Sequence, residues 1–472
     1  MNYLRQVQRH AVAPGSRLAV VTPTEAFGYA ELARRVESAA AALQAAGVTA
    51  GSHVGILVSH EVDHLVASLA LLALGTGQVT LASHDSPSLR DTIARRIGAT
   101  HIVVAGDHEV PDGVIRIGWP LPPSADGLSG DASGTVFLKT SGTTGDMNIV
   151  AFTEQMLADQ SFRHPEYAEE RLLRLAAIEH NNSKRHRLYC VWQGGTNVFR
   201  PSGELDIAGF CRRHAVTCLD ISRMHASDLA ARGNREALVG VRLRTGGSAV
   251  PIDVRRAIEA NVTRELYVRY AATECGAIAM ALPGSHDDDE PVGRPLAGVE
   301  LEIVDDDDAL LPSGAIGHIR LQAPGMASGY LDAGSEANAR FRGGWFWPGD
   351  VGLLRPDGTL VVKGRRDDMM ILNGLNIFPV EIERVLERHP AVAVAAALPL
   401  VSRVHGQIPV AAVELRRGVE VTPAELQAYA RKHLALRSPR RIMILDALPR
   451  NGQGKILRRE IATLFTPSGN AK

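Results

Sequence analysis

The sequence predicts an α/β protein with a large amino-terminal domain and a smaller α+β domain at the carboxyl end. Two observations support this prediction: helical and strand-like segments alternate through the first quarter of the chain, and the character of the sequence changes near Gly364. The length of 472 residues also exceeds what one hydrophobic core usually organises. We expect residues 1–366 to form the large domain and residues 367–472 the small domain.

The alternation is clearest near the amino terminus. Apolar side chains recur with helical spacing over residues 29–46, and Gly47 ends this segment. A strand-like run at 53–58 follows, then an apolar helical segment at 62–74, and then the strand-like runs GQVTLA and HIVVAG. This order predicts a mostly parallel sheet that is covered by helices on both faces and carries binding loops at its strand ends.

The smaller domain is predicted to begin at Asp367, within the polar segment VVKGRRDD. A helix is expected from Pro379, because proline is tolerated in a first helical turn and Ile382, Val385 and Leu386 then share one face. The strand-like runs AVAVAAALPL and VAAVEL, a helical segment from 423 to about 434, and the run IMILDALP complete the unit.

The charge balance excludes two classes of partner. The formal net charge is -1 and the isoelectric point is near 7.0, so the chain lacks the electrostatic signature of a protein that binds nucleic acid or an anionic membrane. Two acidic runs, at 286–290 and 305–308, lie between strand-like segments. They are expected to be solvated turns rather than a metal cluster.

The sequence predicts a cytoplasmic protein without membrane insertion. The amino terminus lacks the apolar core of a signal peptide, and the longest apolar run, at 65–74, is far shorter than the roughly 18 to 20 residues that span a bilayer. The cysteines form no CxxC pair and no zinc-site spacing. They are expected to be small buried apolar groups in a reducing compartment; they are Cys190, Cys211, Cys218 and Cys275.

The stretch FLKTSGTTGDMNIV contains a candidate phosphate-binding loop. Successive backbone N–H groups of a glycine-rich turn can hold an anion, and hydroxyl groups add further donors. A Walker loop is excluded, because no GxxxxGK[ST] string occurs. The alternative is a plain turn between two strands. The residues of the candidate loop are Thr140, Ser141, Gly142, Thr143, Thr144 and Gly145.

Three distant segments add groups that suit a nucleotide. RYAATECG places Thr273 and Glu274 after a strand-like run, and a carboxylate there could hold hydrated Mg²⁺ on phosphates. WFWPGDVG contains Asp350, which could accept hydrogen bonds from a ribose diol. GRRDD and NGQGKILRR supply Arg365 and Lys455.

In this order and spacing, the motifs resemble those of the adenylate-forming superfamily, which includes acyl- and aryl-CoA ligases, nonribosomal adenylation domains and firefly luciferase. The resemblance extends from YAELARRV to GKILRR. It implies a multi-sheet large domain, a mobile small domain and a two-step reaction. A small or aromatic carboxylic acid attacks the α-phosphate of Mg-ATP, and a thiol then takes the acyl group. The thiol belongs to CoA or to the phosphopantetheine of an acyl carrier protein.

The resemblance also implies roles for individual residues. Residues 140–145 hold the β- and γ-phosphates, Thr273 holds the α-phosphate, and Glu274 binds Mg²⁺. Asp350, aided by Arg365, binds the ribose hydroxyls, and Tyr270 belongs to the same ATP-binding set. Lys455 bridges the acid and the α-phosphate, a role that the meeting of two anions independently requires. Two small-domain residues complete the assignment: Asp367 as the hinge, and Gly374 on the path of the thiol.

The chain departs from the family pattern where a lysine usually follows the phosphate loop. Asn148 and Ile149 occupy these positions, so we expect pyrophosphate to bind more weakly unless another cation substitutes for the lysine. Lys139, Lys184 and Arg185 are the candidates. Ile371 and Asn376 replace a frequent lysine and arginine, and a catalytically impaired relative remains the alternative reading.

The acid is expected to bind near His180 and Asn181, a pair that resembles the His-Asn of aryl-acid adenylating enzymes, or that forms a simple polar network. Gly246, Gly247 and Ala271 complete the expected pocket. The polar run 181–183 disfavours long acyl chains. The basic cluster 184–187 is expected to be a solvated face; turned inward, it could meet a second carboxylate or a carrier's phosphate.

Overall fold

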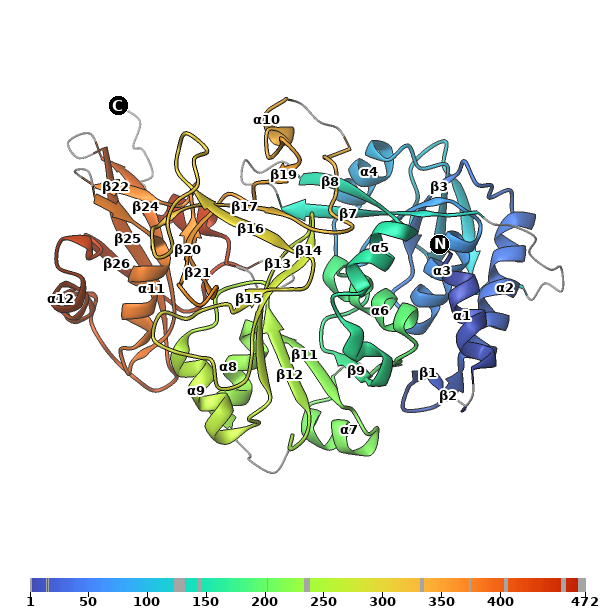
Figure 1. Cartoon of the computed structure of the whole chain (residues 1–472), viewed down its shortest axis with the longest axis horizontal. Helices are drawn as coiled ribbons and strands as arrows, with labels where there is room; N and C mark the ends of the chain where they lie inside the picture. Colours follow the sequence, from blue (N-terminus) through green and yellow to red (C-terminus); the bar gives the residue numbers. More distant parts are fainter. Residues whose placement is uncertain are drawn as a thin grey trace.

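A computed structural model describes residues 2–13, 15, 17–122, 132–141, 147–201, 203–232, 238–331, 335–372, 375–402, 406–450 and 456–465. In this part of the chain, the strands form one nine-stranded sheet, two six-stranded sheets and one five-stranded sheet. Figure 1 shows the amino-terminal elements at one end of the molecule and the carboxyl-terminal elements at the other, with β13 and β14 between them. The predicted α/β class with a multi-sheet large domain is confirmed.

The first six-stranded sheet contains the alternating segments of the amino-terminal region. Its order is β6-β5-β3-β4-β7-β8, parallel except for the last strand. The predicted helices and strands of this region are confirmed to within two residues. The bounds are α1 Tyr3–Val12, α2 Tyr29–Ala45, β3 His53–Leu57, α3 Glu61–Ala73, β4 Gly77–Thr80, α4 Pro87–Arg96, β5 His101–Ala105, β6 Ile115–Trp119, β7 Thr135–Ser141 and β8 Met147–Thr153.

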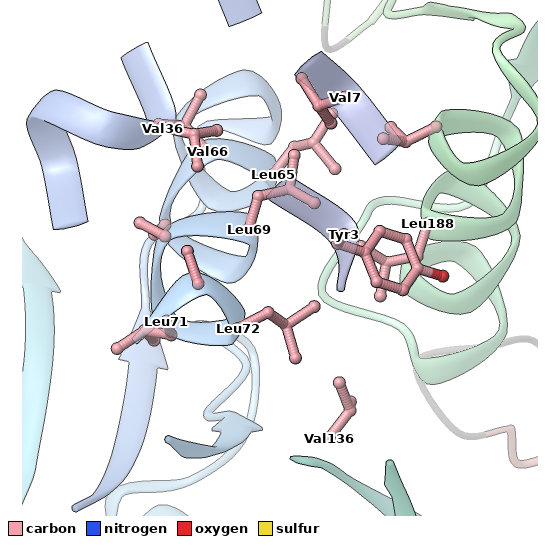
Figure 2. Packing of buried hydrophobic residues seen from close by; sticks show 14 of the residues in the cluster. Tyr3, Val7, Val36, Leu65, Val66, Leu69, Leu71, Leu72, Val136 and Leu188 are labelled. Atoms are coloured by element: carbon pink, nitrogen blue, oxygen red, sulfur yellow. The ribbon is translucent and has the colours of Figure 1, made fainter. Parts of the chain in front are cut away.

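Helix α3 is the centre of the largest core cluster. Its leucines Leu65, Leu69 and Leu72 are fully buried, because α1, α2 and α6 pack against it on different sides. Figure 2 shows these side chains facing Tyr3 and Leu188 from the neighbouring helices. The helix is apolar around most of its circumference, as expected of one that is covered on several sides.

The nine-stranded sheet carries the strand ends at which binding residues were predicted. Its order is β15-β14-β13-β12-β11-β9-β10-β1-β2, and the run from β13 to β1 is parallel. The bounds are β1 Leu18–Val21, β2 Ala26–Gly28, α5 Glu154–Ser161, η1 Pro165–Glu169, β9 Arg171–Arg174, α6 Asn181–Gln193, β10 Thr196–Val198, α7 Ile207–Arg213, β11 Cys218–Ser222, α8 Arg223–Arg232, β12 Arg242–Gly246, α9 Ile252–Asn261, β13 Leu266–Ala272, β14 Gly276–Ala281 and β15 Arg294–Pro295.

The second six-stranded sheet is antiparallel and was not anticipated from the helix–strand alternation. It places Asp350, at the start of β20, directly opposite Arg365, at the end of β21. The two residues are therefore neighbours at the open end of two consecutive antiparallel strands. The bounds are β16 Glu300–Val304, β17 Gly317–Gln322, α10 Ser335–Asn338, β18 Phe341–Arg342, β19 Trp345–Phe346, β20 Asp350–Leu354 and β21 Leu360–Arg365.

The five-stranded sheet and three helices make up the carboxyl-terminal part. The predicted helices and strands are present here, and a capping box formed by Thr422 and Glu425 starts α12. The domain boundary at Asp367 stays a prediction. The bounds are β22 Met370–Leu372, β23 Leu375–Ile377, α11 Pro379–Glu387, β24 Val392–Ser402, β25 Gly406–Leu415, α12 Pro423–Leu434, η2 Ala435–Arg437, β26 Arg441–Leu445 and α13 Arg458–Phe465.

Among the described residues, two ion pairs connect α11 to the amino-terminal domain. Arg384 lies 2.6 Å from the buried carboxylate of Glu290, and Glu387 lies 2.6 Å from Arg223. Glu290 also accepts from the backbone N–H of Ile252 at 3.0 Å. The acidic run 286–290 is thus a turn between β14 and β15 as predicted, except that its last residue is buried and takes part in this contact.

The cysteines and the apolar helices also fit the expectations. All four cysteines are buried and free, and burial raises the pKa of the Cys211 and Cys275 thiols to about 12. Among the described residues, no helix combines the length and apolar character that a bilayer crossing requires.

The buried carboxyl of Glu154 gives a test of the fold. It accepts hydrogen bonds from the backbone N–H groups of Tyr3 and Gly134, and so ties α1 to the start of β7. Burial nevertheless raises its pKa from 4.5 to about 7. Because the pKa of Glu154 is higher in the folded state than in the unfolded state, ionisation of this carboxyl lowers the free energy of unfolding. The loss is absent at a pH below the unfolded-state pKa, grows as the pH rises towards the folded-state pKa, and is complete above it.

We predict that Glu154→Gln removes this titration. The free energy of unfolding of the variant, relative to wild type, should rise by about 3 kcal/mol between about pH 4 and about pH 8, measured by urea unfolding across that range. Glu169→Gln, at a side chain that is 84% exposed, is the control and should show little change. Parallel pH profiles for wild type and Glu154→Gln would contradict the prediction.

Candidate active site

The candidate site is centred on the carboxylate of Asp350. The hydroxyl of Tyr270, near the end of β13, donates a hydrogen bond to this carboxylate. Burial raises the pKa of Asp350, and it outweighs the opposing effects of Arg365 and Tyr270. The contact joins the nine-stranded sheet to the antiparallel sheet, so the carboxylate is held in a desolvated position by two different parts of the fold.

Arg365 connects Asp350 with the predicted hinge residue. Its Nη1 donates to the carbonyl of Pro348 at 2.7 Å and lies 3.5 Å from the Asp350 carboxylate. Its Nη2 lies 3.7 Å from the carboxylate of Asp367. Arg340 contacts the same two groups, Pro348 and Asp367, at 3.1 and 3.4 Å. Asp367 is therefore attached to two arginines of the antiparallel sheet region.

A second carboxylate, Glu274, lies in the turn between β13 and β14. Its Oε1 accepts a hydrogen bond from the hydroxyl of Tyr330 at 2.8 Å, and its backbone carbonyl accepts from the N–H of Ala327 at 2.8 Å. Burial, followed by the negative charge of Glu274, raises the pKa of Tyr330. The hydroxyl therefore remains a donor. No described residue donates to the other oxygen of Glu274, which remains available to a ligand.

Only the first two residues of the candidate phosphate-binding loop lie within the described part of the chain. Thr140 and Ser141 end β7, and Thr140 pairs with Asn148 in the antiparallel ladder between β7 and β8. The loop thus joins two adjacent strands. This arrangement is compatible both with a phosphate-binding loop and with a plain turn between two strands. The following predicted site residues lie outside the described residues: Gly142, Thr143, Thr144, Gly145, Gly374 and Lys455.

The three candidate substitutes for the missing lysine have different partners. Lys139 pairs with Asp85 at 2.5 Å. Lys184 is fully buried against Gln78, and burial lowers its pKa to about 7. Arg185 donates to the backbone carbonyl of Thr273 at 2.7 Å. Only Arg185 touches the segment that carries Thr273 and Glu274.

The predicted acid-binding residues meet around the amino-terminal end of α6. The Asn181 amide donates to the carbonyl of Lys139, and the ring of His180 lies 4.9 Å from that of His84. Burial, aided by the nearby His84 and Lys139, lowers the pKa of His180 to about 4. The imidazole is therefore neutral near neutral pH and offers a hydrogen bond rather than a charge.

Glycines at the end of β12 allow close packing beside this region. A Cβ on Gly246 would lie 2.5 Å from the backbone carbonyl of Arg269, and Gly247 has a φ of +85°. Ala271 lies on the adjacent strand β13 and is half-buried. The absence of a side chain at Gly246 therefore permits the close approach of β12 to β13 at this end of the two strands.

The basic cluster of α6 is not a solvated face, so that expectation was wrong. Lys184, Arg185, His186 and Arg187 are all buried, with exposures of 4% or less. The physical reason is that α1, α3, α5 and η1 all pack against α6, so that no side of the helix is left to solvent at these positions. Arg187 pairs with Glu61 at 2.8 Å, and His186 bonds the Tyr167 hydroxyl at 2.7 Å.

The expected polar entrance at 181–183 is also partly corrected. Ser183 is buried, and its hydroxyl donates to the carbonyl of Ala176 at 2.7 Å. Asn182 is exposed. Ser183 therefore stabilises the start of α6 rather than lining an entrance.

Sequence reasoning missed several residues of the site. Tyr330 and Arg340 contact predicted residues, and Asp85 neutralises Lys139. No local pattern marked these three residues, because each acts through a contact between distant parts of the chain. The carboxylate of Glu179, next to His180, accepts from both the N–H and the hydroxyl of Ser83 at 2.7 and 2.9 Å.

The residues fit a magnesium ion that is bound mainly by phosphates. No group of three histidine, cysteine or acidic side chains that could hold a metal occurs in the described part of the chain. Mg²⁺ in nucleotide sites commonly uses one or two carboxylates together with phosphate oxygens and waters. Glu274, with one oxygen to which no described residue donates, meets that requirement.

Comparisons with known proteins agree with this geometry. A family model described as AMP-binding enzyme matches residues 7–331, and a model described as AMP-binding enzyme C-terminal domain matches residues 381–455. A 2-succinylbenzoate–CoA ligase of Geobacillus kaustophilus (strain HTA426) is 40% identical over 174 residues, which are 37% of this chain and 35% of the relative. That match thus spans about a third of the relative's length.

Other relatives match over almost the whole chain. A 2-succinylbenzoate–CoA ligase of Bacillus subtilis (strain 168) is 28% identical, with 96% of each chain covered. The solved structure of an o-succinylbenzoate CoA synthetase from Bacillus subtilis, in complex with an acyl-adenylate intermediate, superposes with a TM-score of 0.87 at 26% identity, covering 98% and 97% of the two chains. An amide bond synthetase from Marinactinospora thermotolerans shares the fold, with a TM-score of 0.86 at 24% identity over 98% and 99%.

The raised pKa of Asp350 predicts that Asp350→Asn stabilises the free protein. The ionised carboxylate costs folding free energy above its folded-state pKa, and this cost disappears as the pH falls below the unfolded-state value. The thermal midpoint of the variant should therefore exceed that of wild type at neutral pH and approach it in acid.

Asp357→Asn is the matched control with the opposite sign. The Asp357 carboxylate accepts from the N–H and hydroxyl of Thr359, which lower its pKa, so its replacement should lower the midpoint at neutral pH. Scanning calorimetry measures the thermal midpoints of both variants relative to wild type, and their opposite signs at neutral pH test the prediction. A destabilised Asp350→Asn at neutral pH would show that its carboxylate is stabilised in the free protein.

Proposed function

Because the chain belongs to the AMP-binding enzyme family, we propose that it is an acid–thiol ligase that forms an acyl-adenylate from ATP and then transfers the acyl group, most directly to CoA. The observation that carries the proposal is the pair of carboxylates, Asp350 and Glu274, that tyrosine hydroxyls hold at the strand ends. One suits a ribose diol and the other a metal on the phosphates.

The nucleotide roles follow from these positions and from the family motifs. Asp350 accepts hydrogen bonds from the ribose hydroxyls, and Tyr270 and Arg365 keep its carboxylate in place. Thr273 binds the α-phosphate, and the loop at 140–145 binds the β- and γ-phosphates. Glu274 would hold Mg²⁺, which neutralises phosphate charge when bound.

The first step joins the acid to the α-phosphate. A carboxylate oxygen attacks the α-phosphorus, the bond to the β-phosphate oxygen breaks, and the electron pair leaves with pyrophosphate. Both reactants are anions, so a cation placed at their junction lowers the barrier. We assign this role to Lys455, and the neutral His180 offers the acid a hydrogen bond without adding charge.

The second step replaces AMP by a thiol. The sulfur attacks the acyl carbon, and AMP leaves with the oxygen that came from the acid. Lys455 must withdraw to admit the thiol, which requires rotation of the small domain about Asp367. Gly374 is proposed to leave space for the thiol's arm, because a Cβ there would narrow the path.

Two alternatives differ from CoA ligation. A carrier-loading enzyme would ignore free CoA and acylate only a pantetheine-bearing protein. An impaired relative would bind nucleotide but fail to exchange pyrophosphate into ATP. We therefore propose an exchange screen over hydroxybenzoates, anthranilates, short acids and dicarboxylates including 2-succinylbenzoate, followed by thioester assay with CoA. Exchange and CoA thioester formation support the proposal, and absence of exchange with every acid contradicts it.

Lys455→Ala separates the two steps. We expect pyrophosphate exchange to fall by about 100- to 1,000-fold, on the scale of one preorganised donor, while thioester formation from supplied acyl-AMP and CoA continues. Lys432→Ala, an exposed lysine of α12, is the control and should leave both rates near wild type. Equal loss of both steps in Lys455→Ala would refute the assigned role.

Asn148→Lys tests the departure in the phosphate loop. Asn148 is paired with Thr140 at the base of the loop, so a lysine there should add a charge-assisted contact and lower the KM for ATP by about tenfold. Val12→Lys, at a position that is 84% exposed, controls for added charge. An unchanged KM in Asn148→Lys would mean that another group already supplies the contact.

A further inference from the structure

Arg185 is a buried cation that has no acidic partner among the residues that the structure describes. Its side chain comes from α6, and the residue is 4% exposed. Nη1 donates to the carbonyl of Thr273 at 2.7 Å, whereas Nε has no hydrogen-bond partner. Among the described residues, no carboxylate lies within ion-pair distance of the guanidinium. A buried charge that is only partly satisfied is costly, so this arrangement calls for an explanation.

Other buried arginines of the same sheet region are neutralised by acids. Their guanidinium groups lie between 2.5 and 3.2 Å from a carboxylate, so their burial is compensated within the fold. These pairs are Arg174 with Asp220, Arg187 with Glu61, Arg244 with Glu170 and Arg269 with Asp220.

Buried arginines without such a pair donate to several carbonyls. Arg163 donates to three backbone carbonyls, at Cys275, Ala277 and Pro324, and Arg255 also donates to three. Arg185 has one. The neighbouring Lys184 can avoid a buried charge by losing its proton, because its pKa is lowered to about 7. Arginine in proteins stays charged.

The position of Arg185 places this charge beside the reacting groups. Asn181 precedes it by four residues, so both side chains lie on the same face of α6. Its hydrogen bond goes to Thr273, next to Glu274, and its guanidinium carbon lies 5.8 Å from the centre of the Phe152 ring. The charge therefore lies at the junction of the start of α6 and the end of β13, where the acid is proposed to bind.

We propose that Arg185 is a specificity-determining residue that binds a second carboxylate of the acid, so that the substrate is a dicarboxylic acid. One carboxylate reacts at the α-phosphate, and the other forms charge-assisted hydrogen bonds with the donors of Arg185 that the protein leaves unused. The inference rests on the proposed function of the same site. It explains why the charge is kept in the interior without an acid of its own.

The proposal is tested with matched pairs of acids that differ in one carboxylate. The pairs are glutarate and its monomethyl ester, and 2-succinylbenzoate and benzoylpropionate, which lacks the ring carboxylate. The measurement is kcat/KM for exchange of labelled pyrophosphate into ATP. Wild type should prefer the dicarboxylate of at least one pair by about 10- to 100-fold, the range of a hydrogen bond to a charged group.

Variants identify Arg185 as the origin of the preference. Arg185→Gln should abolish the preference, chiefly by raising the KM of the dicarboxylate while sparing that of the monoacid, and Arg185→Lys should keep part of it. Lys184→Gln is the control: its ammonium contacts Gln78 and Thr80 instead, so the ratio should stay as in wild type. If Arg185→Gln does not fold, the ratio of kcat/KM between dicarboxylate and monoacid still tests the proposal in wild type and in Arg185→Lys.

The outcomes separate this inference from the proposed function. Exchange with monoacids and dicarboxylates at equal efficiency would overturn the inference and leave the ligase function standing. A dicarboxylate preference that persists in Arg185→Gln would also overturn it, because the residue would then be only a support for Thr273. Absence of exchange with any acid would overturn the proposed function and this inference together.

Discussion

Two buried carboxylates, each bonded to a tyrosine hydroxyl, are the interaction on which the rest of the site depends. Tyr270 holds Asp350, and Tyr330 holds Glu274. Neutral donors orient a carboxylate without cancelling its charge. The fold therefore keeps negative charge in a desolvated place, at a cost that is visible in the raised pKa of Asp350. Such preorganised carboxylates suit the hydroxyl donors and the metal of the proposed function.

The surrounding charges are arranged to complement this pair. Arg365 and Arg340 connect the Asp350 region with Asp367 at the start of the predicted small domain. Two further ion pairs hold α11 against the large domain. These ion pairs are polar contacts, which suits the rotation of the small domain that we propose between the two chemical steps.

Much of the fold followed from local pattern. Helices α2, α3 and α12 and the strands around them were predictable, because helical spacing, terminating glycine and first-turn proline are properties of short segments. The antiparallel sheet that pairs Asp350 with Arg365 was not predictable in this way, since its strand order, β18-β19-β17-β20-β21, differs from the order of the strands in the chain. The buried charges of α6 were misjudged for a related reason: their partners, such as Glu61 for Arg187, lie far away in the sequence.

The residues of the candidate site likewise divide into those that sequence motifs predict and those that only the fold brings together. Asp350, Glu274 and Arg365 were predicted from motif order, and the structure brings Asp350 and Arg365 together. Tyr330 had no local signature, because its role depends on the fold bringing it to Glu274. The environment of Arg185 could not be predicted from a run of basic residues, because its burial and the absence of an acid beside it in the described part of the chain are properties of packing.

The central claim is that the acid's own oxygen attacks the α-phosphorus of ATP between these two carboxylates. The most direct measurement uses an acid labelled with heavy oxygen in its carboxylate, with the products of one complete turnover analysed by mass spectrometry. The account predicts one labelled oxygen in AMP and none in pyrophosphate. Label in inorganic phosphate or pyrophosphate, with AMP unlabelled, would contradict it.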